Sequence, residues 1–208
     1  MIFDWGGVLT NPIIDTVSAW LKADQIDLGS YTAAIRPWIE RAYGQVGTES
    51  PVHALERGEL TDPEFEAILA GLLVGLDGEP VRADGLLRRM FAATEMVPAM
   101  VDLVRELRGS GTRTGLLSNS WGVRDGYPRD LLAELFDDVV ISGEVGMRKP
   151  EERIFRLAVD RLGLTPAECA FVDDVEANVA AAAALGFIGV HHNATEATKT
   201  RLAELLAP

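Results

Sequence analysis

The sequence predicts an α/β fold: a Rossmann-like three-layer core around a parallel sheet, with an inserted all-helical cap domain. Two observations predict it. From residue 96 onward, short apolar or β-branched runs alternate with helical patterns, as in parallel sheets with helices on both faces. Between residues 13 and 94, in contrast, apolar residues recur only at helical spacing. The apolar start MIFD adds one more strand to the core.

The core elements alternate regularly along the chain. Predicted strands cover residues 1–4, 112–118, 139–142, 169–174 and 186–192. Predicted helices between them cover residues 100–107, 131–136, 150–162 and 176–185. Gly109 and Gly111 end the first of these helices, and Pro150 begins the third, where a missing N–H is tolerated. The pattern therefore predicts a five-stranded parallel sheet.

The insert between the first two strands reads as four helices. Apolar stripes with a period of 3.6 residues cover residues 13–21, 35–43, 65–73 and 86–91. The third stripe follows Thr61-Asp62-Pro63-Glu64, which has the pattern of a capping box. We expect a core domain formed by residues 1–11 and 95–208 and a C1-type cap formed by residues 12–94.

Composition excludes several classes of protein. A chain of 208 residues with 48% hydrophobic residues can bury one domain core and a smaller module. The net charge of −13 argues against a nucleic-acid partner, because phosphate backbones attract basic surfaces. No membrane span or signal peptide is recognisable, so we expect a cytoplasmic protein. The single Cys169 lies in an apolar run and is interpreted as a core residue.

The start of the chain raises a separate question. Only three residues precede Asp4, whereas a strand usually runs to about five or six residues. Whether the coding start is trimmed is therefore open.

Polar residues stand where the predicted strands end. In open parallel sheets, ligands bind beyond the carboxyl ends of the strands, so these positions are the candidates for a site. A lysine at the start of the helix after the third strand joins them. The candidate residues are Asp4, Ser118, Asn119, Lys149, Asp173 and Asp174.

These residue types favour a magnesium site beside a phosphate. Carboxylates at neighbouring strand ends repel one another unless a cation lies between them, and Mg²⁺ prefers such oxygen ligands. The lysine and the hydroxyl can then hold the phosphate oxygens of a small phosphorylated metabolite. Each residue alone has a simpler interpretation: Asp173-Asp174 as a helix cap, Ser118 as a turn residue and Lys149 as a surface lysine.

The order of the motifs resembles the haloacid dehalogenase-like hydrolase superfamily over the whole chain. Four segments carry the resemblance in order: FDWGGVLT, LLSNS, GMRKPEERIF and FVDDVEANVAAAAALG. The helical insert stands in the place of a C1-type cap. ERGELTDPEF in the insert and GMRKPEERIF in the core are most similar to bacterial sugar-1-phosphate phosphatases and to the N-terminal phosphatase domain of soluble epoxide hydrolase.

The resemblance implies a role for each candidate residue. Asp4 would be the nucleophile that forms an aspartyl-phosphate. Ser118 and Lys149 would bind the transferring phosphoryl group, assisted by the backbone amide of Asn119. The ligands of Mg²⁺ would be Asp4, the backbone carbonyl of Gly6, Asp174 and, through a water molecule, Asp173.

Gly6 departs from the superfamily pattern. Most phosphatases of this superfamily carry a second aspartate two residues after the nucleophile, which protonates the leaving group; here that carboxylate is missing. A hydrolytic 2-haloacid dehalogenase is therefore one alternative, because those relatives also lack this aspartate. A weakened, non-catalytic binding protein is another. Since a metal-free site gains nothing from Asp173-Asp174, we expect a Mg²⁺-dependent phosphatase.

Other residues near the motifs have both functional and structural interpretations. A histidine in the insert could donate a proton, an arginine beside Lys149 could contact phosphate, and two tryptophans could line a pocket. Surface and core roles are the stronger expectation for the histidines and tryptophans. These residues are His53, Arg148, Trp5, Trp121, His191 and His192.

Overall fold

One parallel sheet forms the centre of the computed structural model, which describes residues 1–43, 50–122 and 126–207. Within these residues its strands are β1 (Ile2–Phe3), β2 (Gly115–Ser118), β3 (Asp138–Ile141), β4 (Ala170–Asp173) and β5 (Ile188–His191). Their order is β3-β2-β1-β4-β5, and every neighbouring pair is parallel. The predicted α/β fold with a five-stranded parallel sheet is confirmed; β3 has the predicted length, shifted by one residue, and the other four strands are shorter than predicted.

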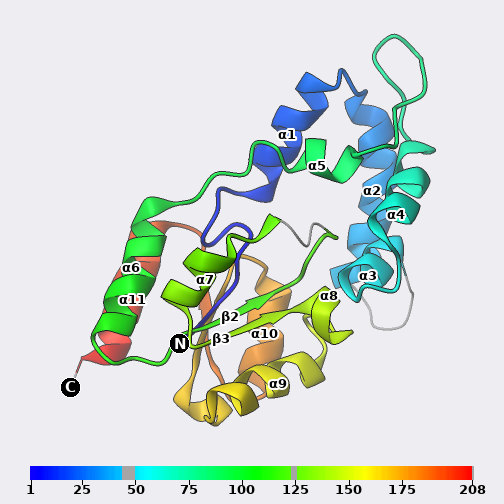
Figure 1. Cartoon of the computed structure of the whole chain (residues 1–208). Helices are drawn as coiled ribbons and strands as arrows, with labels where there is room; N and C mark the ends of the chain where they lie inside the picture. The colour runs from blue at the N-terminus through cyan, green and yellow to red at the C-terminus, as the bar shows by residue number, and fades with distance from the viewer. Residues whose placement is uncertain (44–49, 123–125, 208) are drawn as a thin grey trace.

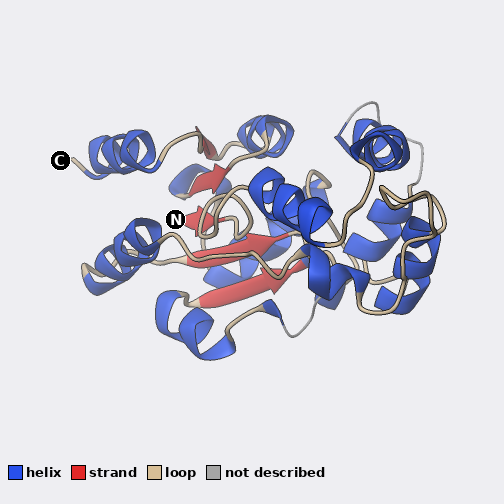
Figure 2. Ribbon diagram, turned by 90° about the horizontal axis from the view of Figure 1, so that it is seen from above, coloured by secondary structure: helices blue, strands red, loops and turns tan. Residues whose placement is uncertain are grey.

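Helices cover both faces of the sheet (Figures 1 and 2). On one face lie α6 (Pro98–Gly109), α7 (Arg129–Leu135) and α11 (Thr195–Leu206), whose buried side chains share a cluster with the strands. On the other lie α9 (Glu152–Leu162) and α10 (Glu176–Ala184). Shorter pieces are α8 (Ser142–Val145) and a 3₁₀ turn at Pro166–Glu168. In the described chain, no helix combines the length and apolar character that crossing a membrane requires.

β1, β2, β3 and β4 each contribute to both hydrophobic clusters because successive side chains point to opposite faces. Phe3 and Leu116 pack against α6, α7 and α11, whereas Ile2 and Leu117 pack against α9 and α10. Both faces are therefore apolar, which explains why these strands read as continuous hydrophobic runs and not as alternating ones. Cys169 is fully buried in the second cluster, as expected.

A separate group of helices lies beyond the ends of β2 and β3 (Figure 1). We call it the helical cap; it comprises α1 (Ile13–Ala23), α2 (Leu28–Tyr43), α3 (Pro51–Glu56), α4 (Asp62–Ala70) and α5 (Leu86–Met90). It packs around its own buried cluster. The predicted capping box begins α4, where the backbone N and the hydroxyl of Thr61 lie 2.8 and 2.7 Å from the Glu64 carboxylate. The sequence did not predict α3, and α2 begins well before its predicted stripe.

The chain enters and leaves the cap through two paired segments. Thr10 and Met96 form an antiparallel bridge. The N–H of Asn11 donates to the carbonyl of Glu95 at 2.9 Å, and the N–H of Val97 donates to that of Leu9 at 2.8 Å. These contacts support boundaries near residues 11 and 95, which we retain as a proposal for the division into core and cap.

Candidate active site

Three neighbouring strands bring the candidate residues together. β1 lies between β2 and β4, so Asp4, Ser118 and Asp173 stand at adjacent strand ends. The N–H of Asp4 donates to the carbonyl of Val172 at 2.9 Å, which continues the ladder one residue beyond β1. The Asp4 backbone is therefore fixed at the carboxyl edge of the sheet, where ligands bind in such folds.

Lys149 places its ammonium group at this edge of the sheet, next to two of the acids. Its side chain is only 1% exposed, so the interpretation as a surface lysine is wrong. The Nζ atom lies 2.8 Å from Asp4 Oδ1 and 2.6 Å from Asp173 Oδ2. Asn119 holds the lysine backbone through two hydrogen bonds: Lys149 N–H donates to Asn119 Oδ1 at 2.8 Å, and Asn119 Nδ2 donates to the Lys149 carbonyl at 3.0 Å. This side-chain role of Asn119 was not predicted.

The Asp173 carboxylate is enclosed by hydrogen-bond donors. Besides Lys149, it accepts from the N–H of Val175 at 2.8 Å and from Asn178 Nδ2 at 3.1 and 3.2 Å. Asp173 is fully buried. Its contacts fix the position of the lysine and begin the segment leading into α10, so the helix-cap interpretation describes part of what Asp173 does.

Asp174 occupies space that Gly7 leaves open. Gly7 has φ = 71°, a left-handed conformation that glycine adopts readily. A Cβ atom on Gly7 would lie 2.1 Å from Asp174 Oδ2, so no side chain fits there. The glycine thus lets a third carboxylate approach Asp4.

The three acids form a cluster that fits a divalent cation. Asp4, Asp173 and Asp174 each offer an oxygen, and these atoms lie within 4.8 Å of one another. Burial raises the pKa of Asp4, against the opposing effect of Lys149. Burial, reinforced by Asp173, raises the pKa of Asp174 to about 6. Three carboxylates against one lysine leave excess negative charge, which a hard cation such as Mg²⁺ would neutralise with the oxygen ligands it prefers.

Opposing effects act on the lysine itself. Burial disfavours the charged ammonium of Lys149, but the carboxylates of Asp173 and Asp4 outweigh this effect and raise its pKa. Lys149 is therefore a permanent cation at neutral pH.

Tyr127 joins the site without having been predicted. Its hydroxyl lies 2.8 Å from Ser118 Oγ, and both side chains are buried. Burial raises the pKa of Tyr127, so the phenol stays protonated at neutral pH. The sequence carries no local signal for this contact, because Tyr127 does not end a predicted strand.

A cavity of about 350 Å³ opens beside these residues. It extends from the strand ends to α1 and to the segment around α5. Gly6 lies in its wall: a Cβ atom there would come within 3.4 Å of Ile13 Cδ1, an ordinary contact. The described lining residues are Trp5, Gly6, Thr10, Asn11, Ile13, Thr16, Arg88, Phe91, Ala92, Thr94, Ser118, Asn119, Trp121, Gly126 and Tyr127.

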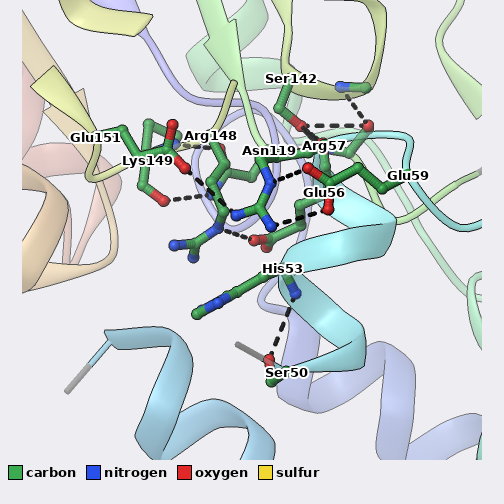
Figure 3. A network of polar contacts seen from close by, with 12 residues as sticks. Ser50, His53, Glu56, Arg57, Glu59, Asn119, Ser142, Arg148, Lys149 and Glu151 are labelled. Atoms are coloured by element: carbon green, nitrogen blue, oxygen red, sulfur yellow. Dashed lines mark hydrogen bonds and ion pairs between the residues drawn. The ribbon is translucent and has the colours of Figure 1, made fainter. Parts of the chain in front are cut away.

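A second buried charge group joins the cap to the core (Figure 3). Arg148 Nε lies 2.5 Å from Glu56 Oε2, and neither side chain is more than 4% exposed. Ser142 Oγ donates to the Glu56 carbonyl at 2.6 Å. Arg57 extends the contact to Glu151, 3.5 Å away. Arg148 is thus engaged by the cap and does not line the cavity, whereas its neighbour Lys149 faces the acids.

The histidines have local partners. His191 Nε2 lies 3.0 Å from the Asp174 carbonyl, and His192 Nδ1 lies 2.8 Å from Thr198 Oγ1. His53 lies on α3, where its backbone N–H donates to Ser50 Oγ. It is not among the described lining residues of the cavity. Trp5 and Trp121, in contrast, both line the cavity, in addition to packing against neighbouring rings.

Comparisons with known proteins agree with this geometry. The family model for haloacid dehalogenase-like hydrolases matches residues 1–186. The chain is 30% identical to a sesquiterpene phosphatase of Aspergillus oryzae, over 99% of the chain and 95% of that protein. It is 32% identical to acyl-CoA dehydrogenase family member 10 of Mus musculus, over its whole length but only 19% of that protein. The structure of a HAD-like family hydrolase from Porphyromonas gingivalis matches with a TM-score of 0.72 and 27% identity, covering 100% of this chain and 97% of the other.

Proposed function

Because this chain belongs to the haloacid dehalogenase-like hydrolase family, we propose that it is a Mg²⁺-dependent phosphatase of small phosphorylated metabolites. The observation that carries the proposal is Asp4: a fixed carboxylate in contact with Lys149, next to Asp174 and directly before Trp5 and Gly6, which line a cavity. The phosphatase among the relatives supports the same reaction class.

In the proposed reaction, Asp4 attacks the phosphorus atom of the substrate. A carboxylate oxygen forms the new P–O bond and the ester P–O bond breaks; the leaving alkoxide takes the electron pair and a proton from solvent water. Water then attacks the aspartyl-phosphate, releasing inorganic phosphate and restoring the carboxylate. Lys149 holds Asp4 in place and balances the charge of the phosphoryl oxygens, and Ser118 is placed to donate a hydrogen bond to them.

The ligands proposed for Mg²⁺ are Asp4, Asp174 and the backbone carbonyl of Gly6. When bound, the cation supplies charge neutralisation at the phosphoryl group. Asp173 acts as a positioning residue through Lys149, since its oxygens already accept several hydrogen bonds. A water-mediated contact of Asp173 with the cation stays a prediction.

A screen of phosphorylated metabolites tests the proposal. We expect phosphate release that requires Mg²⁺ and disappears in Asp4→Asn, because an amide neither attacks phosphorus nor binds the cation well. The exposed Asp102→Asn provides a matched control and should retain full activity. Full activity of Asp4→Asn, or in excess chelator, would exclude this mechanism. Halide release from a 2-haloacid without added metal would favour a dehalogenase instead; we expect none.

A further inference from the structure

The cavity beside Asp4 has an unusual wall for a site that handles a charged ester. Most of its accessible surface is apolar, and its large side chains are Trp5, Ile13, Phe91, Trp121 and Tyr127. Among the described lining residues Arg88 is the only charged one, and it is exposed. No carboxylate lines the cavity within that set, and Gly6 contributes no side chain.

Several polar groups in this wall are already bonded to the protein. The Thr10 hydroxyl lies 3.3 Å from the N–H of Gly7 and from the Asn11 carbonyl. The Asn11 side chain donates to the Ala93 carbonyl at 3.2 Å and accepts from the N–H of Glu95 at 2.8 Å. Beyond these two residues, the polar side chains of the wall are the exposed Arg88, Thr16, Thr94 and, at the strand ends, Ser118, Asn119 and Tyr127; the rest of the wall is hydrocarbon.

We propose that this cavity binds the organic part of the substrate and that this part is a hydrocarbon-rich, uncharged group, so that the enzyme selects apolar phosphate esters over polar ones. The inference rests on the proposed function for its phosphate end. Ile13 is 42% exposed although it lines the cavity, as expected of a side chain that a bound apolar group would cover. A volume of about 350 Å³ lies at the lower end of the ~300–1,000 Å³ of pockets that hold small ligands, so the group is compact.

Straight-chain alkylphosphonates test this without depending on turnover. Binding of methyl- to hexylphosphonate is measured by titration calorimetry with Mg²⁺ present. Each added methylene should tighten binding by about three- to fourfold until the cavity is full. Replacing butylphosphonate by the equally long 3-hydroxypropylphosphonate should reverse the gain, because the cavity offers the hydroxyl few free partners.

Two neighbouring isoleucines of α1 provide matched variants. Ile13 lines the cavity, whereas Ile14 is 68% exposed and does not line it. Ile13→Asn should flatten the dependence of affinity on chain length, and Ile14→Asn should leave it unchanged. Affinity independent of chain length in the natural protein, or equal effects of the two variants, would overturn the inference.

The outcome separates this inference from the proposed function. Length-dependent phosphonate binding without phosphate release from any ester would leave the apolar cavity intact and exclude the phosphatase. Phosphate release with equal preference for polar and apolar esters would support the phosphatase and contradict the preference for apolar esters.

Discussion

Among the residues that the structure describes, the charged groups at the sheet edge and at the junction with the cap differ in the ratio of acids to cations. At the sheet edge, three acids, Asp4, Asp173 and Asp174, lie around the single cation Lys149; we call these four residues the surplus group. At the junction with the cap, one acid, Glu56, pairs with one arginine, Arg148; we call these two residues the balanced pair. Burial opposes the charged forms of Asp4, Asp174 and Glu56.

The ratio of acids to cations distinguishes the proposed binding site at the sheet edge from the structural contact between cap and core. The single charge of Glu56 is matched by Arg148; the arginine and a hydrogen bond from Trp121 oppose the effect of burial, which still raises the pKa of Glu56. The sheet edge keeps a surplus of carboxylates that the protein itself does not neutralise. Since isolated buried charge is costly, the surplus of carboxylates is the feature on which the proposed Mg²⁺ site rests.

Adding another carboxylate to the surplus group should have the largest effect. In the natural protein, slow protonation of the leaving group should make rates depend steeply on leaving-group pKa, with nitrophenyl phosphate favoured over alkyl phosphates. Gly6→Asp should flatten this dependence and raise alkyl phosphate turnover, since general acid–base help is typically worth about 10²- to 10⁴-fold. The space beside Ile13 admits the new Cβ. Rates across an aryl and alkyl phosphate series provide the measurement.

A flat dependence in the natural protein would mean that another group already donates the proton. Tyr127 would then be the next residue to test, because its hydroxyl lies in the cavity wall and is protonated at neutral pH. Tyr127→Phe would remove that proton while keeping the ring.

Breaking the balanced pair should lower the free energy of unfolding and not the rate of catalysis. Glu56→Gln leaves the permanently charged Arg148 buried without its acid, and removing one partner of a buried pair costs about 3–5 kcal/mol. The double variant Glu56→Gln/Arg148→Met should recover much of this loss. Urea unfolding provides the free energies, with the exposed Glu152→Gln as a control. An unchanged free energy in Glu56→Gln would show that the pair contributes nothing.

The smallest effect should appear in the pH dependence of stability. Because the pKa of Asp174 is raised from 3.8 to about 6, the folded state holds this proton more tightly than the unfolded state. Without metal, the free energy of unfolding should therefore fall as pH rises from about 4 to 6. Mg²⁺ should oppose this fall above pH 6, and Asp174→Asn should reduce it. Thermal unfolding measured across this pH range, with and without Mg²⁺, tests the prediction. The same pH dependence with and without Mg²⁺ would contradict the assignment of Asp174 as a ligand of the cation.

The sequence predicted the surplus group better than the balanced one. Asp4, Ser118 and Asp173 end apolar strands, so the sheet rule alone placed them together. Glu56 lies 92 residues from Arg148, and α3 is too short for a periodic pattern. Contacts between cap and core depend on tertiary packing, which local patterns do not encode.

Tyr127 and Gly7 show the same limit. Tyr127 belongs to no motif and ends no predicted strand, so nothing in the sequence indicated that its hydroxyl would meet Ser118. Gly7 admits Asp174, and this role depends on two segments that are 167 residues apart in the sequence, at positions 7 and 174.

Magnesium binding by titration calorimetry tests the central claim most directly. At pH 7.5 the natural protein should bind a single Mg²⁺ per chain, and Asp174→Asn should abolish that binding because it removes one proposed ligand from the surplus group. The double variant Glu56→Gln/Arg148→Met, which alters only the balanced pair, should bind Mg²⁺ as the natural protein does. No binding by the natural protein, or equal binding by Asp174→Asn, would contradict the account.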